Sequence, residues 1–392
     1  MVAGRRILLA YLVYYAGIGA AFPYLPVFYR DIGLDLAEIG ALTAVQAAVQ
    51  LLFAPVWGGL ADRFPRTRVT LPLAAVVATV GATILFLAVG FGAVVAGSLI
   101  LYSGLSGIGP TLDARTLETL GPARRNRFGE VRAFGSLAFV LATVAVGFLL
   151  DAKGARSLFW AYLPFLVMTA VVTATIPRRG GTIRSVSLLR GAGEFLATKG
   201  VALFLVGFTV VWTSLAAVTA FYSIQIVSLG GSPGLVGIAW AIGASIEVPY
   251  MYAFPRVAGW FGTERIVVIG SLAFALRGLL AALAADPVAL VLIAPLEGLG
   301  FASVFVGGVT VLAAHAPPGL QGTAQGLFAA CAGLATIIGS FGGGAIAGAL
   351  SIPGLFLVGA VVSLTGTGIM AIALLGPGSG RIPSPGREVG TA

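Results

Sequence analysis

Segment 110–136, PTLDARTLETLGPARRNRFGEVRAFGS, places an acid and a base where they could bind a polar solute. The sequences on both sides of it are strongly apolar, so it predicts a hairpin between two helices. Asp113 lies nine residues before Pro122 and Arg132 lies ten residues after it. With a rise of about 1.5 Å per residue, the two side chains should reach nearly the same depth. An isolated charge in an apolar layer is expensive, so we expect the two to pair. The pair could hold a ligand or only lock two helices together.

A second hairpin carries Arg277 and Glu297, which are twenty residues apart on either side of a turn at Asp286–Pro287. A carboxyl group beside an arginine can gain or lose a proton when its surroundings change, as a proton-coupling residue must. A static ion pair is the alternative. Glu247, in ASIEVPYMYAFPR, shows no partner at the same depth in the sequence. It is a third candidate for proton coupling, unless it meets Arg115 or Arg132.

Side chains with a polar group, most of them aromatic, occur in two apolar segments, residues 7–28 and 201–228, which occupy corresponding places in the two halves of the sequence. Such side chains suit a site for a polar ligand within a membrane. Packing or anchoring at the membrane interface is the alternative. The candidates for substrate binding from these segments are Tyr15, Trp212, Tyr222 and Gln225.

The composition identifies the class of protein that must position these residues. Hydrophobic residues make up 58% of the 392 residues and charged residues 9%, whereas a soluble domain carries about 25% charged residues. We therefore expect an all-α polytopic membrane protein. Twelve apolar runs are long enough to span a bilayer. They are residues 7–28, 36–60, 69–90, 93–119, 128–150, 157–177, 201–228, 234–255, 265–285, 288–314, 321–350 and 353–376.

The basic residues predict the orientation of these helices. When the runs alternate across the membrane, 17 of the 23 Lys and Arg residues fall on the side of the N-terminus and three on the other side. The positive-inside rule then places both termini in the cytoplasm of a multi-pass protein of the cell membrane. The net charge of +9 follows from this topology, so we expect no nucleic-acid partner.

Motifs for covalent or metal chemistry are absent from the sequence. It contains no HExxH, no CxxC pair and no Walker loop. The single Cys331 cannot form an intrachain disulfide. Residues 7–28 have no cleavage pattern after a short apolar core, so we expect no cleavable signal peptide. We predict that the protein is not an enzyme and needs no cofactor or metal.

Two related halves account for the chain. A shift of 197 residues lays Gly33 on Gly230, Gly40 on Gly237 and Ser106 on Ser303. We predict a six-helix bundle in residues 1–177, a basic cytoplasmic linker in 178–200, a second six-helix bundle in 201–376 and a disordered cytoplasmic tail in 377–392. A duplication of this kind is typical of transporters that bind their substrate between two bundles.

The loop after the second apolar run reads GGLADRFPRTR, residues 58–68. Gly58, Asp62, Arg63 and Arg66 resemble the G-x-x-x-D-R-x-G-R-R signature of the major facilitator superfamily, although Pro65 replaces its glycine. The physical interpretation is a conformational latch, in which Asp62 meets the positive N-terminus of the helix near Gly322. The arginines would bind lipid phosphates of the inner leaflet, and simple anchoring of this kind is the alternative.

Residues 19–28, GAAFPYLPVF, are similar to a first-helix segment of the lactose permease and its oligosaccharide:proton symporter group. Residues 110–136 also resemble that group, through P-x-x-[DE]-A, a basic tip and F-G-x-x-R-x-F-G. The resemblance implies that Asp113 and Arg132 bind sugar hydroxyls and that Phe139 is the aromatic platform under the sugar ring. It also implies a role in proton coupling for Arg277 and Glu297. The segment around Glu247 resembles the neighbouring phenylpropionate-permease-like branch.

The chain departs from that group at two places. Gly300 stands where the group has a further carboxylate, and VVWTSLAAVTAFYSIQ carries none of the group's acids. The resemblance implies the major facilitator fold and secondary transport by alternating access. We expect a monomer that carries a small polar solute, a sugar, a nucleoside or an aromatic acid, by proton-coupled symport. The alternative is a proton-driven exporter of drugs or metabolites.

Overall fold

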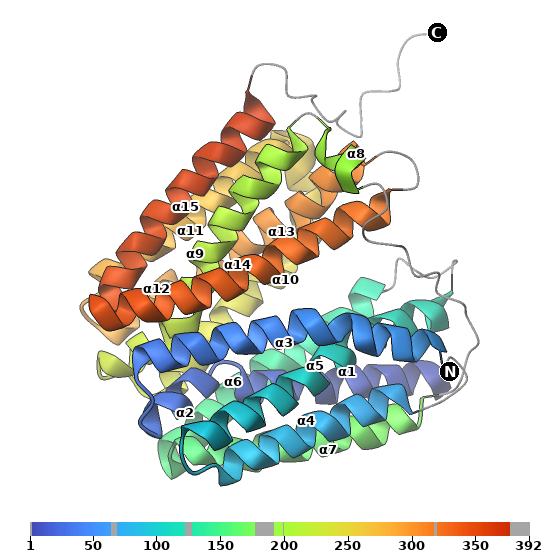
Figure 1. Cartoon of the computed structure of the whole chain (residues 1–392), viewed down its shortest axis with the longest axis vertical. Helices are drawn as coiled ribbons and strands as arrows, with labels where there is room; N and C mark the ends of the chain where they lie inside the picture. Colours follow the sequence, from blue (N-terminus) through green and yellow to red (C-terminus); the bar gives the residue numbers. More distant parts are fainter. Residues whose placement is uncertain are drawn as a thin grey trace. The chain divides into compact units, whose positions relative to one another are not determined.

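The computed structural model describes residues 2–63, 69–121, 128–176, 192–198, 200–316 and 320–376 (Figure 1). The described residues form α-helices and one short 3-10 helix, η2. The elements are α1 (Val2–Ala21), α2 (Leu25–Asp31), α3 (Leu36–Arg63), α4 (Thr70–Leu87), α5 (Phe91–Leu120), α6 (Phe128–Lys153), η2 (Ala155–Ser157), α7 (Leu158–Ala174), α8 (Ala192–Leu196), α9 (Val201–Ser228), α10 (Pro233–Phe261), α11 (Thr263–Leu283), α12 (Pro287–Ile293), α13 (Pro295–His315), α14 (Gln321–Ala349) and α15 (Ile352–Leu375).

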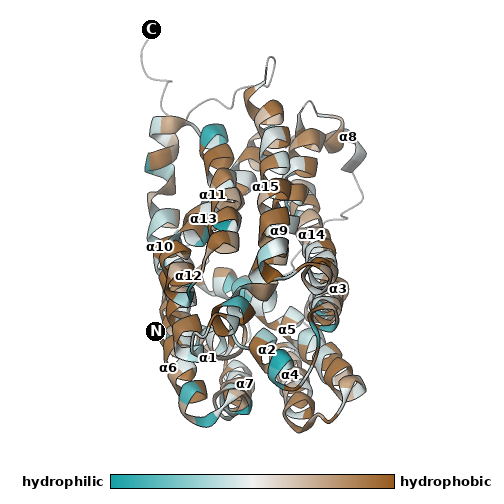
Figure 2. Ribbon diagram, turned by 90° about the vertical axis from the view of Figure 1, so that its left-hand side faces the viewer, coloured by the Kyte–Doolittle hydropathy of each residue, from teal (hydrophilic) through white to brown (hydrophobic). Residues whose placement is uncertain are grey.

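Twelve helical spans in the described residues are long and apolar enough to cross a membrane, which confirms the predicted number. Figure 2 shows hydrophobic residues along most of their length. Two of the runs predicted as continuous are interrupted. The first breaks between α1 and α2, where Pro26 starts the second piece, and the tenth breaks before Pro295. A proline ring has no N–H to continue the helical ladder, so each break falls at a proline.

The helix boundaries repeat at the predicted offset. Shifting α3, residues 36–63, by 197 gives 233–260, and α10 occupies 233–261. Shifting α5, residues 91–120, gives 288–317, which α12 and α13 cover as 287–315. The two halves of the sequence therefore build the same succession of helices.

The chain forms two compact units. Unit 1 comprises Met1–Arg184 and Ser223–Ala241, and unit 2 comprises Ser185–Tyr222 and Ile242–Ala392. The end of α9 and the start of α10 therefore belong to unit 1, together with the loop that joins them. The predicted bundle boundaries at 177 and 201 stay a prediction.

In unit 1, α1 packs against α6 and α7, and α4 packs against α5 and α7. Ile7, Tyr11, Leu71 and Leu112 form a buried cluster beside the candidate residues on α5 and α6. Small residues allow the helices to come close: a Cβ at Gly97 on α5 would lie 2.9 Å from the Leu85 backbone nitrogen on α4. Close approach through small residues is how membrane helices gain contact area.

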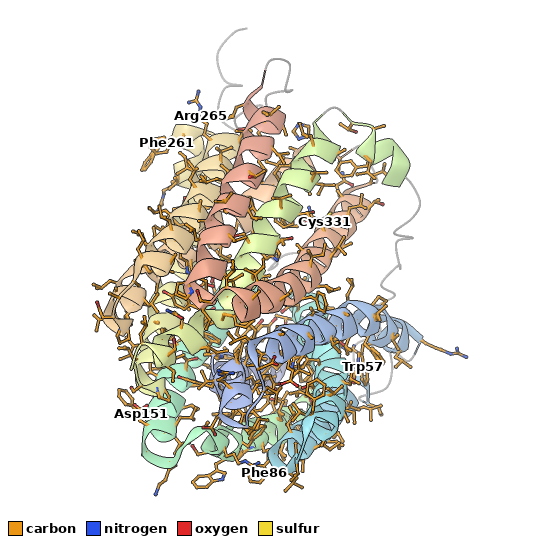
Figure 3. All side chains as sticks on the ribbon, turned by 60° about the vertical axis from the view of Figure 1, so that its left-hand side comes forward. Trp57, Phe86, Asp151, Phe261, Arg265 and Cys331 are labelled. Atoms are coloured by element: carbon orange, nitrogen blue, oxygen red, sulfur yellow. The ribbon has the colours of Figure 1, made fainter. Side chains whose placement is uncertain are left out.

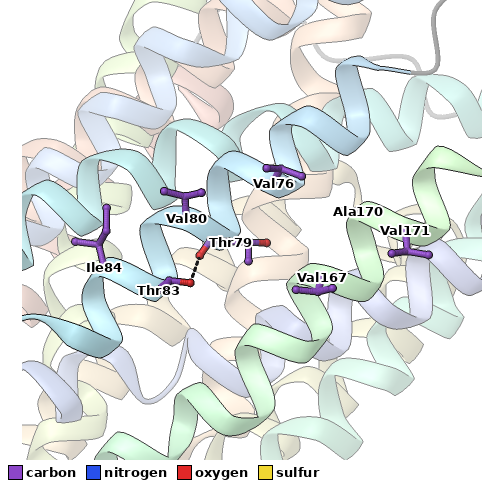
Figure 4. A pocket seen from close by; sticks show the side chains of 8 residues that line it. All are labelled: Val76, Thr79, Val80, Thr83, Ile84, Val167, Ala170 and Val171. Atoms are coloured by element: carbon purple, nitrogen blue, oxygen red, sulfur yellow. Dashed lines mark hydrogen bonds between the residues drawn. The ribbon is translucent and has the colours of Figure 1, made fainter.

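An apolar groove of about 420 Å³ lies between α4 and α7 (Figure 4). Val76, Val80, Val167 and Val171 line it and are each at least 48% exposed. The hydroxyl of Thr83 donates to the Thr79 carbonyl oxygen of its own helix, so it offers the groove little polarity. These properties fit a surface that faces lipid.

In unit 2, α11 packs against α13 and α15. A large aromatic cluster fills its core and includes Phe204, Phe208 and Phe328. Phe195 of the short helix α8 is fully buried in the same cluster. The last residues of the predicted linker thus contribute to the core of unit 2, whereas residues 178–191 and the tail 377–392 lie outside the described residues.

Candidate functional site

Asp113, on α5, is held by a tyrosine from α1. The Tyr11 hydroxyl donates a hydrogen bond of 2.5 Å to Asp113 Oδ1. Tyr11 is fully buried, and Asp113 is partly buried. A hydrogen bond to an ionised carboxylate is about twice as strong as one between neutral groups. Tyr11 therefore fixes one carboxylate oxygen.

Arg132, on α6, lies over a second tyrosine of α1. Its guanidinium carbon is 4.9 Å from the centroid of the Tyr15 ring, a cation–π distance. The Tyr15 ring stacks on Tyr11 with a centroid distance of 5.9 Å and an angle of 10° between the planes. Gly135 makes room for this ring, since a Cβ there would lie 2.6 Å from Tyr15 Cδ2. One helix therefore supports both candidate charges.

In the described part of the chain no ion pair joins Asp113 to Arg132, contrary to the pairing expected from their depth. The carboxylate binds Tyr11 and the exposed guanidinium faces Tyr15. The depth estimate took no account of the tyrosines, which give each charge its own contact. The Asp113 carboxylate on α5 and the Arg132 guanidinium on α6 therefore do not bind each other, and both can still bind a ligand.

Tyr11 is the residue of this site that sequence reasoning missed. The signal was present in YLVYY, where Tyr14 and Tyr15 lie three and four positions after Tyr11 and therefore stand beside it on one face of a helix. Tyr14 completes the group, with its ring edge-on to Tyr15 at 5.1 Å between centroids. Phe139 lies two helical turns after Arg132 and is partly buried, so α6 presents both residues on one side.

The second candidate group lies in unit 2. Arg277 on α11 is 1% exposed, and its Nη2 lies 3.0 Å from Glu297 Oε2 on α13. Its guanidinium carbon is 4.2 Å from the centroid of the Tyr222 ring on α9. The Tyr222 hydroxyl in turn donates to the Leu290 carbonyl oxygen. The predicted Arg277–Glu297 contact is therefore present, and an aromatic face covers the arginine.

Arg277 is incompletely satisfied. Its Nε is buried and has no hydrogen-bond acceptor among the described residues. A buried donor without an acceptor is destabilising and is rare in folded proteins. Glu297 retains 19% of its side-chain exposure, so its carboxyl group keeps some access to solvent. A pair of this kind can rearrange at a lower cost than a fully hydrogen-bonded one.

Glu247, on α10, makes a polar or electrostatic contact in the structure. The α10 backbone packs closely on α13 at this level, since a Cβ at Gly298 would lie 3.0 Å from the Glu247 backbone nitrogen. The backbone of Glu247 therefore lies against the α13 residue that follows Glu297. Its role in proton coupling stays a prediction.

The remaining candidates from α9 have mainly packing contacts. Trp212 lies within an aromatic cluster, with ring centroids 5.1 Å from Phe208 and 5.5 Å from Phe301. Gln225 is buried, and its Oε1 accepts a hydrogen bond of 3.2 Å from the Ser228 hydroxyl. Their assignment to the substrate site stays a prediction, as does that of Tyr222.

The predicted latch lies at the end of α3. Gly58 and Arg63 belong to that helix, and a Cβ at Gly58 would meet nothing within 4 Å. The Asp62 side chain and Arg66 lie outside the described residues. Their proposed contacts stay predictions.

Comparison with known proteins identifies the family. The model of the MFS_1 like family matches residues 5–358. The maltose permease of Geobacillus stearothermophilus is 30% identical over 281 residues, which cover 71% of this chain and 70% of the permease. This chain belongs to the MFS_1-like family.

Two further comparisons extend over nearly the whole chain. The transporter YwbF of Bacillus subtilis (strain 168) is 24% identical over 373 residues, 92% of this chain and 90% of that protein. The crystal structure of the nucleoside transporter NupG matches with a TM-score of 0.83 and 17% identity, covering 95% of this chain and 99% of that one. The second match shows the fold. This major facilitator superfamily protein is a multi-pass membrane protein and a secondary transporter, not an enzyme.

The two candidate groups of this transporter should differ in how much stability depends on them. Arg277→Ala would leave Glu297 without its partner, so we expect the free energy of unfolding to fall by about 3–5 kcal/mol. Arg132→Ala removes an exposed cation–π contact and should cost about 0.5–1 kcal/mol. Denaturant unfolding of the purified protein in detergent measures both. Equal losses would contradict the distinction between a buried pair and an open site.

Proposed function

We propose that this secondary transporter carries a small polyhydroxylated solute, a sugar or a nucleoside, by alternating access together with a proton. It would act as a monomer in the cell membrane with both termini in the cytoplasm. The observation that carries the proposal is the placement of Asp113 and Arg132 on neighbouring helices, each held by a tyrosine and neither neutralising the other.

Hydroxyl groups fit this arrangement because each can donate and accept. A solute hydroxyl can donate to Asp113, and the same or a neighbouring hydroxyl can accept from Arg132. Only Oδ1 of the carboxylate is engaged by Tyr11, so Oδ2 remains the oxygen for a ligand. An aromatic acid fits less well, because its carboxylate would be attracted by Arg132 but repelled by Asp113.

Aromatic side chains complete the proposed site. Tyr14 and Tyr15 lie beside Arg132, and Phe139 follows it on the same side of α6. Faces of sugar rings and nucleobases pack on aromatic rings, while the polar groups fix their orientation. The similarity to a maltose permease over 71% of the chain supports a sugar as the first solute to test.

Proton coupling is assigned to unit 2. Glu297 would carry the proton, because its carboxyl group is partly exposed and faces Arg277. Protonation of Glu297 would release Arg277, whose Nε already lacks an acceptor, and would allow the pair to separate. Glu247 is the second carboxyl group of this proposal, on the helix that packs against α13.

The first test is binding. Maltose and uridine serve as probes in a thermal-shift assay, because a ligand that binds only the folded protein raises its stability. We expect a shift with one probe in the unaltered protein and none in Arg132→Ala. Gly135→Ala should lower the affinity for that probe by at least about tenfold, because its methyl group would displace the Tyr15 ring.

Arg265→Ala is the matched control, since Arg265 is an exposed arginine in the first turn of α11. It should leave the shift unchanged. Full retention of the shift in Arg132→Ala would contradict the assignment of the site. A shift with 3-phenylpropionate but with neither other probe would contradict the solute class.

The second test separates coupling from solute movement. In proteoliposomes, Glu297→Gln should abolish accumulation of the solute that an imposed proton gradient drives, because an amide cannot take up the proton. Exchange of internal for external solute should continue, since exchange does not require net proton movement. Accumulation and exchange would be measured with the same labelled solute. An equal loss of both would indicate a structural ion pair, and outward movement driven by the gradient would indicate an exporter.

A further inference from the structure

Unit 1 contains a contact between helices that are far apart in the sequence, and the functions assigned above do not use it. The Asp151 carboxylate, near the end of α6 (Figure 3), binds the start of α10 through both oxygens. Oδ1 accepts a 2.9 Å hydrogen bond from the Gly234 N–H, and Oδ2 accepts a 3.0 Å hydrogen bond from the Ser232 hydroxyl. The Gly234 N–H is one of those at a helix start that have no partner within the helix.

The corresponding helix of the first half is capped differently. Position 35 corresponds to 232 and position 38 to 235 at the offset of 197. In α3 the cap is local: the Glu38 N–H donates to Asp35 Oδ1 at 2.7 Å and the Asp35 N–H to Glu38 Oε2 at 2.9 Å. In α10 the second acid is replaced by Leu235. The Ser232 hydroxyl still accepts the Leu235 N–H at 3.3 Å, as Asp35 accepts the Glu38 N–H, and Asp151 adds a carboxylate from a second helix that α3 does not use.

Small residues bring α6 and α10 into direct contact below this cap. Thr143, Gly147 and Asp151 are four residues apart and form one row on α6. A Cβ at Gly147 would lie 2.8 Å from the Pro233 carbonyl oxygen and 2.9 Å from Gly234 Cα. A Cβ at Gly237 would lie 2.7 Å from the Thr143 carbonyl oxygen. The two backbones therefore touch where side chains would otherwise separate them.

Two contacts from the segment between α1 and α2 cover the same region. The Tyr24 hydroxyl donates to the Thr143 carbonyl oxygen, and the Phe22 ring packs edge-on against Trp240 with 5.3 Å between centroids. The Trp240 indole N–H also donates to the Ser223 hydroxyl at 3.0 Å. Most of the α6–α10 contact is close packing of small residues. Such packing gains little stability from the exclusion of water inside a bilayer. The charged cap is its strongest directional interaction.

We propose, resting on the alternating access proposed above, that Asp151 acts as a latch on the α6–α10 contact and sets how long this contact stays closed in each transport cycle. The cap suits this task because it joins two helices by two hydrogen bonds at an exposed position. Water can replace those hydrogen bonds when the latch opens. On the predicted topology this end faces outward. The latch would use the same chemistry that the sequence predicts for Asp62 at the opposite face, a carboxylate at one helix end bound to the start of another helix.

A single reporter thiol tests the proposal without a transported solute. Ala241 is buried and lies one turn after Gly237 on the face of α10 that meets α6, so Ala241→Cys in a Cys331→Ala background should react with N-ethylmaleimide only when the latch opens. In proteoliposomes we expect Asp151→Ala to raise the labelling rate by about tenfold, because it removes two hydrogen bonds to a charged group. Gly147→Ala should act in the same direction by forcing the backbones apart. Ser232→Ala, which removes one of the two bonds to Asp151 together with the local acceptor of the Leu235 N–H, should raise the rate by less.

Two matched controls separate the latch from general loosening. Asp286→Ala removes a carboxylate that caps its own helix α12 through the N–H groups of Val288 and Ala289. Gly92→Ala adds a methyl group where a Cβ would meet nothing within 4 Å. Both should leave the labelling rate unchanged. An unchanged rate in Asp151→Ala, or an equal rise in the controls, would overturn the proposal. If Asp151→Ala fails to fold, Ser232→Ala decides in its place by the same criteria.

Discussion

The cost of placing charge inside apolar helices governs how this transporter is built. Asp113, Arg132 and Arg277 each contact a side chain that lowers this cost. Tyr11 holds Asp113, the Tyr15 ring lies under Arg132, and Arg277 lies between Glu297 and the Tyr222 ring. Tyrosine serves this purpose well, because its ring packs like a hydrophobic residue and its hydroxyl or π-face meets a charge.

The charged side chains have different kinds of partner in the two units. In unit 1, the tyrosines hold one acid and one base separately, so both keep capacity to bind a solute. In unit 2, the acid and the base bind each other and the arginine is fully buried. The first arrangement fits recognition of a polar molecule. The second fits a pair whose contact can be changed by one proton, which is why the proposal divides binding and coupling between the units.

Much of this architecture was predictable from the sequence because apolar length and charge distribution determine membrane helices strongly. The number of spans, the repeat offset of 197 and the Arg277–Glu297 contact all follow from residue spacing. Spacing does not give the rotation of a helix about its axis, so the separate tyrosine partners of Asp113 and Arg132 could not be predicted from depth. The same holds for the capping of α10 by Asp151, because the contact joins residues 83 positions apart. The breaks before Leu25 and Pro295 had a local signal in their prolines, but proline alone does not locate a break, since Pro55 and Pro110 lie inside continuous helices.

Entrance counterflow tests the central claim, that Asp113 and Arg132 hold a solute which the protein carries across the membrane. Proteoliposomes are loaded with unlabelled maltose or uridine and diluted into a trace of the labelled solute, with ionophores present to collapse all gradients. We predict that the labelled solute accumulates transiently in the unaltered protein and that Asp113→Asn abolishes this accumulation while the protein stays folded. Undiminished counterflow in Asp113→Asn would contradict the account, and so would binding of the solute without any counterflow in the unaltered protein.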